Sequence, residues 1–122
     1  ATDQQWMAAQ KLSQEAIQLR AKPGTENQEQ AVAKFADALR IWQVIDDPLM
    51  VAHTLFYLAS GYRRMGQTQH ALVYYSYLTE LTRAHPEWRE LPSALGGLAN
   101  VMLELGEQRK ALVYLNQALG EW

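Results

Sequence analysis

Histidine is the first residue type in this sequence whose spacing could indicate chemistry. Its only imidazoles are His53, His70 and His85, which are separated by seventeen and fifteen residues. A zinc site of the metalloprotease kind needs two histidines on one helix turn next to a glutamate, and no pair here has that spacing. We therefore expect no bound metal. His85 beside Pro86 is more typical of the end of a helix.

A serine and a pair of glycines also have neighbours that suggest chemistry. Ser60 lies between Ala59 and Gly61, but a nucleophile elbow follows a strand, whereas Ser60 falls in the middle of a helical pattern. Gly96 and Gly97 lack the flanking strand and the lysine or third glycine of a phosphate-binding loop. Each glycine inside a helix costs about 1 kcal/mol relative to alanine, so close packing or a cleared groove floor is expected there. We predict no catalytic residue and no cofactor.

Composition excludes further classes of protein. The 122 residues are 48% hydrophobic, which is enough for one domain with a core. Eleven Lys and Arg against thirteen Asp and Glu give a net charge of -2 without a basic stripe, so no nucleic-acid binding is expected. The absence of cysteine excludes disulfides, thiolate nucleophiles and cysteine-based metal sites. Apolar runs are only a few residues long, so we expect no membrane insertion and favour a cytoplasmic location.

The dominant feature of the chain is an internal repeat of forty residues. A shift of forty aligns eight identities within 26 positions, where average composition gives about two. The residues Leu55, Leu58, Ala59, Gly66, Ala71, Leu72, Val73 and Tyr74 fall on Leu95, Leu98, Ala99, Gly106, Ala111, Leu112, Val113 and Tyr114. The same shift aligns Ala31 with Ala71, Phe35 with Tyr75 and Ala38 with Leu78.

Each repeat is predicted to be a pair of helices. Apolar residues recur every three or four positions, which is the spacing of one helix face. Gly66 and Gly106 lie just past the last residue of such a face, where a left-handed backbone is cheapest without a Cβ. Ala59 and Ala99 are expected to face a neighbouring helix at close range, where a side chain must be small. Each unit is therefore a tight helical hairpin.

Several residues predict where the helices begin and end. Pro23 and Gly24 break the first pair, and we expect a looser elbow through residues 24–27. Asp47 before Pro48 is typical of an N-cap followed by proline at the first helical position. Pro92 predicts that the fifth helix starts late or is kinked.

The predicted fold class is all-α, without strands. Three antiparallel helix hairpins form one domain, 1–122, with approximate repeats 3–46, 47–85 and 86–122. Each hairpin alone leaves apolar surface exposed, so stacking completes the core and coils the array into a superhelix with a concave groove.

These residues resemble the tetratricopeptide repeat (TPR). The family's unit has a large apolar residue, a leucine, a small residue and an aromatic on the first helix, a glycine at the turn, and alanine, aromatic and alanine on the second. The second unit matches through Leu55, Leu58, Ala59, Tyr62, Gly66, Ala71 and Tyr75. The other units match through Gly24, Ala31, Phe35 and Ala38, and through Leu95, Leu98, Ala99, Gly106, Ala111 and Ala118. The forty-residue period resembles the long-helix variety of kinesin light chains and of many bacterial, notably cyanobacterial, repeat proteins.

The resemblance implies that the superhelical solenoid is right-handed. It also implies a non-catalytic protein–protein interaction scaffold that holds a peptide or protein in its groove or at its open end. The family's groove positions fall on His53, Phe56, Ser60, Arg63, Ser93, Gly96, Asn100 and Leu103. The glycine alignment would extend this lining to Lys11, Gln14 and Gln18. The chaperone-tail clamp of the family needs lysine and asparagine on a surface that Phe56, Gly96 and Leu103 largely occupy here, so no chaperone tail is expected.

Two alternatives remain open. The last helix has an apolar face with no capping helix after it, formed by Leu112, Leu115, Leu119 and Trp122. Such a face favours a homo-oligomer or further repeats in a longer parent protein. A helical-bundle sensor of small molecules would instead need convergent polar residues in the core, and none stands out.

The tryptophans can be interpreted in the same way. Trp6, Trp42 and Trp122 fall on apolar helix faces and are expected to pack. Trp88 falls at a junction, where it either packs or forms an exposed anchor for a partner.

Overall fold

The computed structural model describes residues 2–88 and 94–120 and contains six helices in this part of the chain. They are α1 (Thr2–Arg20), α2 (Thr25–Val44), α3 (Pro48–Arg64), α4 (Thr68–Arg83), α5 (Ala94–Glu104) and α6 (Gln108–Gly120). No strand occurs among the described residues. The predicted all-α fold of three hairpins is confirmed.

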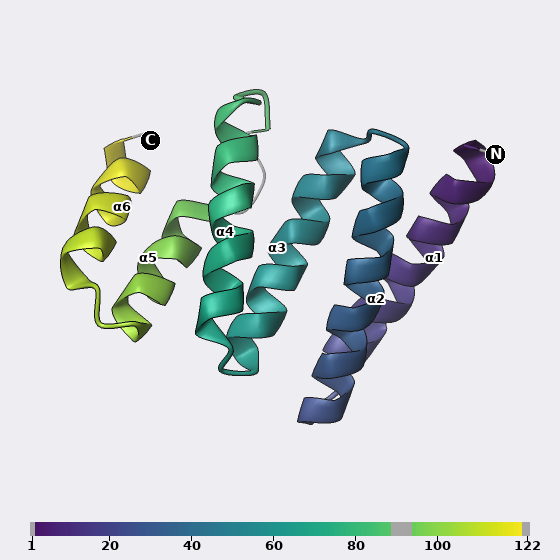
Figure 1. The fold of residues 1–122 in the computed structure, drawn as a ribbon, viewed down its shortest axis with the longest axis horizontal. Coiled ribbons are helices and arrows are strands. Elements are labelled where there is room, and N and C mark those ends of the chain that lie inside the picture. Colours follow the sequence, from purple (N-terminus) through teal and green to yellow (C-terminus); the bar gives the residue numbers. More distant parts are fainter. Residues whose placement is uncertain (1, 89–93, 121–122) are drawn as a thin grey trace.

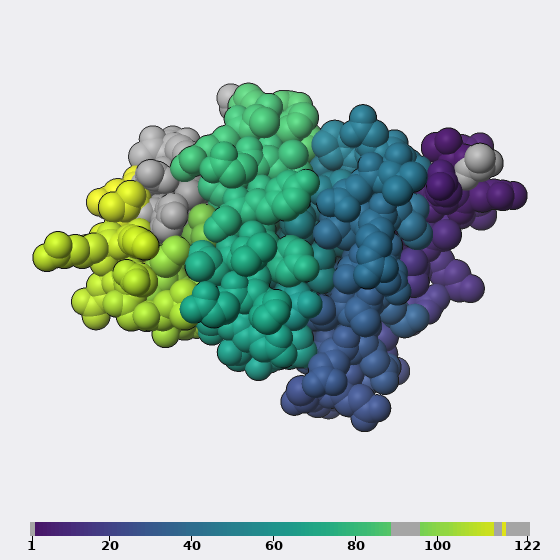
Figure 2. Space-filling model, viewed as in Figure 1, coloured from purple at the N-terminus to yellow at the C-terminus, as the bar shows by residue number. Residues whose placement is uncertain are grey.

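The helices form a row in which each packs against its neighbours along the chain. Figure 1 shows them alternating in direction from α1 at one end to α6 at the other. The two termini therefore lie at opposite ends of the row. Helix α3 also contacts α5, so the first helices of the last two hairpins lie side by side. Figure 2, viewed from the same side as Figure 1, shows the face on which α2, α4 and α6 form much of the surface.

The turns between helices use left-handed backbone where the sequence predicted it. Gly66 and Gly106 have φ values of 76° and 79°, and the N–H of Gly66 donates to the carbonyl of Arg63 at 3.0 Å. Such bonds satisfy carbonyl groups that the end of a helix leaves free. Asp46 has the same conformation after α2, with φ 57°, although it is not glycine. Aspartate tolerates this region better than most residues, because its short side chain can bond locally.

The prediction of a loose elbow in the first hairpin was wrong. Helix α2 begins at Thr25, directly after Gly24, so three of the four residues assigned to the elbow lie in the first turn of the helix. Gly24 has φ 104°, a conformation that only glycine adopts readily. The amide of Asn27 donates to the carbonyl of Pro23 at 2.9 Å and supports this early start.

The start of α3 agrees with its predicted cap. The carboxylate of Asp47 accepts a hydrogen bond from the N–H of Met50 at 3.2 Å, and Pro48 is the first residue of the helix. This bond satisfies one of the free N–H groups at the helix start. Pro92 lies outside the described residues, and α5 is described from Ala94 onwards.

The core runs through the row as two adjoining clusters. In the first, Phe35 and Trp42 of α2 are buried against Leu55 of α3. The second joins α3, α4 and α5 through buried residues that include Tyr75. Ala59 is fully buried there, as its small size predicted.

The structure shows how far the tryptophan predictions hold. Trp42 is fully buried, whereas Trp6 is 42% exposed and meets the Trp42 ring edge-on, with 5.9 Å between the ring centroids. Trp88 is half-buried and stacks on His85 with 3.9 Å between centroids. Trp88 also packs against the core, as the packing interpretation predicted, and whether its exposed part contacts a partner stays a prediction. Trp122 lies outside the described residues.

Candidate functional site

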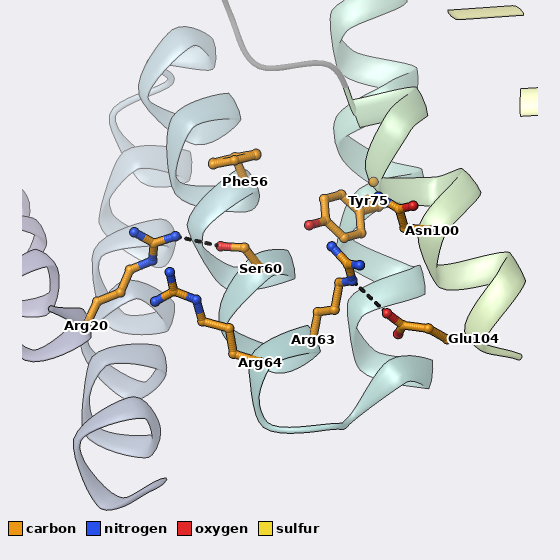
Figure 3. Close-up of a pocket in the computed structure, with 9 residues that line it drawn as sticks. Arg20, Phe56, Ser60, Arg63, Arg64, Tyr75, Asn100 and Glu104 are labelled. Atoms are coloured by element: carbon orange, nitrogen blue, oxygen red, sulfur yellow. Dashed lines mark hydrogen bonds and ion pairs between the residues drawn. The ribbon is translucent and has the colours of Figure 1, made fainter. Parts of the chain in front are cut away.

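A pocket of about 530 Å³ opens between the first helices of neighbouring hairpins. We call it the α3–α5 pocket (Figure 3). Its lining comes from the end of α1, from α3, α4 and α5, and consists of Arg20, Phe56, Ser60, Arg63, Arg64, Tyr75, Gly97, Asn100 and Glu104. The stacking of hairpins therefore creates it, and no single hairpin contains it.

The contact between Tyr75 and Gly97 sets the position of α5 at this pocket. The Tyr75 ring is only 3% exposed, and a Cβ placed on Gly97 would lie 2.7 Å from its Cζ atom. Only glycine leaves room for the ring at this distance, which is the close packing expected for the glycine pair. Burial raises the pKa of Tyr75, and the positive charge of Arg63 offsets part of that effect.

One end of the pocket carries two arginines without an acidic partner. The Nη2 group of Arg20 donates to the hydroxyl of Ser60 at 3.4 Å, and its guanidinium lies 5.2 Å from the ring centroid of Tyr57. Arg64 projects toward Arg20 from α3 (Figure 3). No carboxylate of the described residues forms an ion pair with either arginine. Burial, and then the charge of Arg64, lower the pKa of Arg20.

The other end of the pocket is electrically balanced. The Nε of Arg63 donates to Oε1 of Glu104 at 2.9 Å, and this ion pair joins α3 to α5. Both side chains are more than one third exposed, so the pair contributes little stability by itself. It nevertheless fixes the guanidinium of Arg63 beside Tyr75 (Figure 3).

Phe56 provides an apolar wall between the two ends. Its ring is half-buried and packs against both core clusters. It meets the ring of Tyr57 edge-on, with 5.9 Å between centroids. Ser60 lies one turn further along α3, and its hydroxyl also bonds to the carbonyl of Tyr57 at 3.3 Å. The pocket thus combines an aromatic surface with hydrogen-bonding groups.

The structure brings together half of the residues that the sequence predicted for the groove. Four of them line the pocket: Phe56, Ser60, Arg63 and Asn100. Of the other four, His53 and Gly96 are half-buried and Leu103 is 49% exposed, and none of the three lines the pocket. Ser93 lies outside the described residues. Whether a partner binds at any of these positions stays a prediction.

The predicted groove positions did not include five of the lining residues. They are Arg20, Arg64, Tyr75, Gly97 and Glu104. Helical spacing could have found three of them, because Arg64, Gly97 and Glu104 each lie four residues after a predicted lining residue and so share its face. The extension to Lys11, Gln14 and Gln18 does not reach the pocket, which α1 lines only through Arg20.

The predicted end face lies largely outside the described side chains. Leu112 is 60% exposed, as an uncovered face requires. Leu115 and Leu119 have no described side chains, and Trp122 lies beyond the described residues. Self-association through this face stays a prediction.

Two further features bear on the kinds of site present. Among the described residues, no group of three or more histidine, aspartate or glutamate side chains is arranged to hold a metal ion. None of the described helices combines the length and the apolar character that a membrane span needs.

The fold is similar to that of a tetratricopeptide-repeat domain of known structure. The chain matches the crystal structure of the TPR domain of Arabidopsis FLU with a TM-score of 0.79, over 99% of this chain and 97% of that chain. The two sequences are 22% identical. No family model matches the chain, and no curated protein matches it. The TPR-like fold that the repeat pattern predicted is confirmed.

Proposed function

We propose that this chain, which has a TPR-like fold, is a non-catalytic interaction module that binds a peptide or protein partner in the α3–α5 pocket. Domains built from stacked helix pairs present extended inner surfaces that they use for binding. The pocket offers an aromatic wall and hydrogen-bonding groups rather than a nucleophile beside a general base. Partner binding is thus the function that its residues support best.

The half-buried position of Phe56 is the observation that carries this proposal. Interfaces gain most of their affinity from a few aromatic or arginine side chains that a partner covers completely. Phe56 is held by the core on one side and lines the pocket with the other. Asn100 across the pocket is exposed and can bond to the backbone of an extended segment. An apolar partner side chain against Phe56, with its backbone near Asn100, fits this arrangement.

A selection from a random peptide library displayed on phage tests the proposal. Phe56→Ala should weaken binding of the selected peptides by about 2 kcal/mol or more, measured by calorimetry. Arg63→Ala should cost only about 0.2 to 1 kcal/mol, because the side chain is partly exposed. Val73→Ala is the matched control, since Val73 is an exposed apolar residue of α4 that does not line the pocket.

Phe56 also packs against the core, so loss of folding must be separated from loss of binding. Phe56→Leu keeps an apolar side chain there and should preserve helicity while still reducing affinity. If the selected peptides bind all four variants equally well, they do not bind in the α3–α5 pocket and the proposal is wrong.

A second candidate function is self-association of the chain as a structural repeat. Leu112 and Val113 of α6 are 60% and 53% exposed. Adjacent exposed apolar side chains favour burial against a second copy of the chain. The oligomeric state, measured by sedimentation, tests this candidate independently of the pocket.

A further inference from the structure

We infer that the Arg20–Arg64 end of the α3–α5 pocket binds a phosphate monoester carried by a side chain of the partner, so that the preferred ligand is a phosphorylated peptide. This inference rests on the proposed function and adds the chemical class of the partner to it.

The first argument is unbalanced charge. The pocket contains Arg20, Arg63 and Arg64 but only one carboxylate, that of Glu104, and this carboxylate is already bound to Arg63. Two positive charges therefore remain at one end, within a chain whose net charge is -2. The two positive charges repel each other, and the charge of Arg64, after burial, contributes to lowering the pKa of Arg20. An anion between the two guanidinium groups would relieve this repulsion.

The second argument is an unused hydrogen-bond donor. The Nε of Arg20 is buried and has no hydrogen-bond partner among the described residues. A buried donor without a partner costs free energy, which a ligand acceptor can recover. The Arg20–Ser60 bond is long at 3.4 Å, so it does not hold the guanidinium tightly. Arg20 therefore keeps an unpaired donor, which an incoming anion reaches once the guanidinium shifts from its long bond to Ser60.

The third argument distinguishes a phosphate from a carboxylate. A carboxylate carries one negative charge, whereas a phosphate monoester carries about -1.5 to -2 near neutral pH and has three acceptor oxygens. Two converging arginines match the charge and the number of acceptors of the phosphate. Arg63, whose charge Glu104 already balances, does not compete for the ligand, and the Glu104 carboxylate repels an anion from that end. The two ends of the pocket therefore differ in charge. The phosphate of the peptide is directed to Arg20 and Arg64, and the peptide residues next to it are directed past Phe56.

The test compares peptide libraries that differ at one fixed central residue, which is phosphoserine, glutamate or serine. We expect the phosphoserine library to bind at least about tenfold more tightly than either of the others, because charge-assisted hydrogen bonds to both arginines are added. Arg64→Gln should remove this preference, so that the phosphoserine library binds no more tightly than the serine library. Arg40→Gln is the matched control, because Arg40 is exposed on α2, pairs with Asp37 and does not line the pocket.

A second measurement locates the phosphate. Titration of the protein with O-phosphoserine, at constant ionic strength, should shift the NMR signal of the Arg20 Nε–H group in a saturable way. In Arg64→Gln the shift should require about tenfold more ligand. Inorganic phosphate should bind more weakly than the phosphoserine peptides, because it lacks the contacts along Phe56.

Several outcomes would overturn the inference. They are equal binding of the glutamate and phosphoserine libraries, equal affinity for inorganic phosphate and the phosphoserine peptides, and tighter binding to vesicles containing phosphatidic acid than to any peptide. The same experiment tests the proposed function separately. If unphosphorylated peptides bind in a Phe56-dependent manner while phosphoserine gives no preference, only this inference fails and the proposed function stands.

Discussion

The adjacent glycines of α5 allow the packing of this helix to be tested with a single methyl group. At Gly96 an added Cβ would meet no described atom within 4 Å, so Gly96→Ala should stabilise the fold by about 0.5 to 1 kcal/mol through helix propensity alone. At Gly97 the same Cβ would lie 2.7 Å from Cζ and 2.8 Å from Cδ1 of Tyr75. The buried ring cannot swing into solvent, so overpacking should cost about 2 to 3 kcal/mol, near the top of the usual range.

The two substitutions should therefore have opposite signs. After the gain in helix propensity of about 1 kcal/mol, Gly97→Ala should destabilise the protein by about 1 to 2 kcal/mol. Urea denaturation followed by circular dichroism measures both variants under the same conditions, and Gly96→Ala serves as the control for propensity. If Gly97→Ala were as stable as Gly96→Ala, α5 would not pack against Tyr75 as the structure shows.

The remaining predictions concern packing, charge and assembly. Ala59→Trp or Ala99→Trp should each destabilise the fold by about 3 kcal/mol, because both alanines are fully buried, and unchanged melting temperatures would contradict the repeat register. Lys34, 2.8 Å away, lowers the pKa of Glu15, so the ion pair stabilises the fold above the unfolded-state pKa of this carboxyl group and is lost as pH falls through its lowered value. Glu15→Gln should accordingly reduce the urea midpoint at neutral pH and leave it unchanged in acid. Sedimentation over a wide concentration range should show self-association that Leu112→Glu abolishes, and a monomer at every concentration would contradict the end-face prediction.

The turns of the fold could be predicted from the sequence wherever glycine marks them. Gly66 and Gly106 adopt the left-handed conformation that their position after a helical pattern predicted. Asp46 adopts it without being glycine, and a single aspartate is too common a residue to indicate this. The start of α2 was also missed, because the residue types of Thr25 and Glu26 do not distinguish the first turn of a helix from a loop.

The pocket was predictable only in part because its lining depends on helix rotation. Successive residues of a helix point about 100° apart, so an error of one position changes which side chain faces the pocket. The pocket contains Gly97 and Glu104, each one residue after a position that the family pattern gave for the groove. The rotation of α5 is set by the fit of Gly97 against Tyr75, a contact between helices that spacing along one helix does not reveal. Arg20 was missed because it reaches the pocket from a different hairpin.

Mapping the bound peptide onto the protein tests the central claim most directly. NMR amide shifts of the uniformly labelled chain, recorded with a peptide selected from the phage library, show which face the peptide covers. We predict that the largest shifts occur at Phe56, Ser60 and Asn100, around the α3–α5 pocket. Shifts confined to the exposed residues of α4, such as Val73 and Tyr77, with none at the pocket, would contradict the claim.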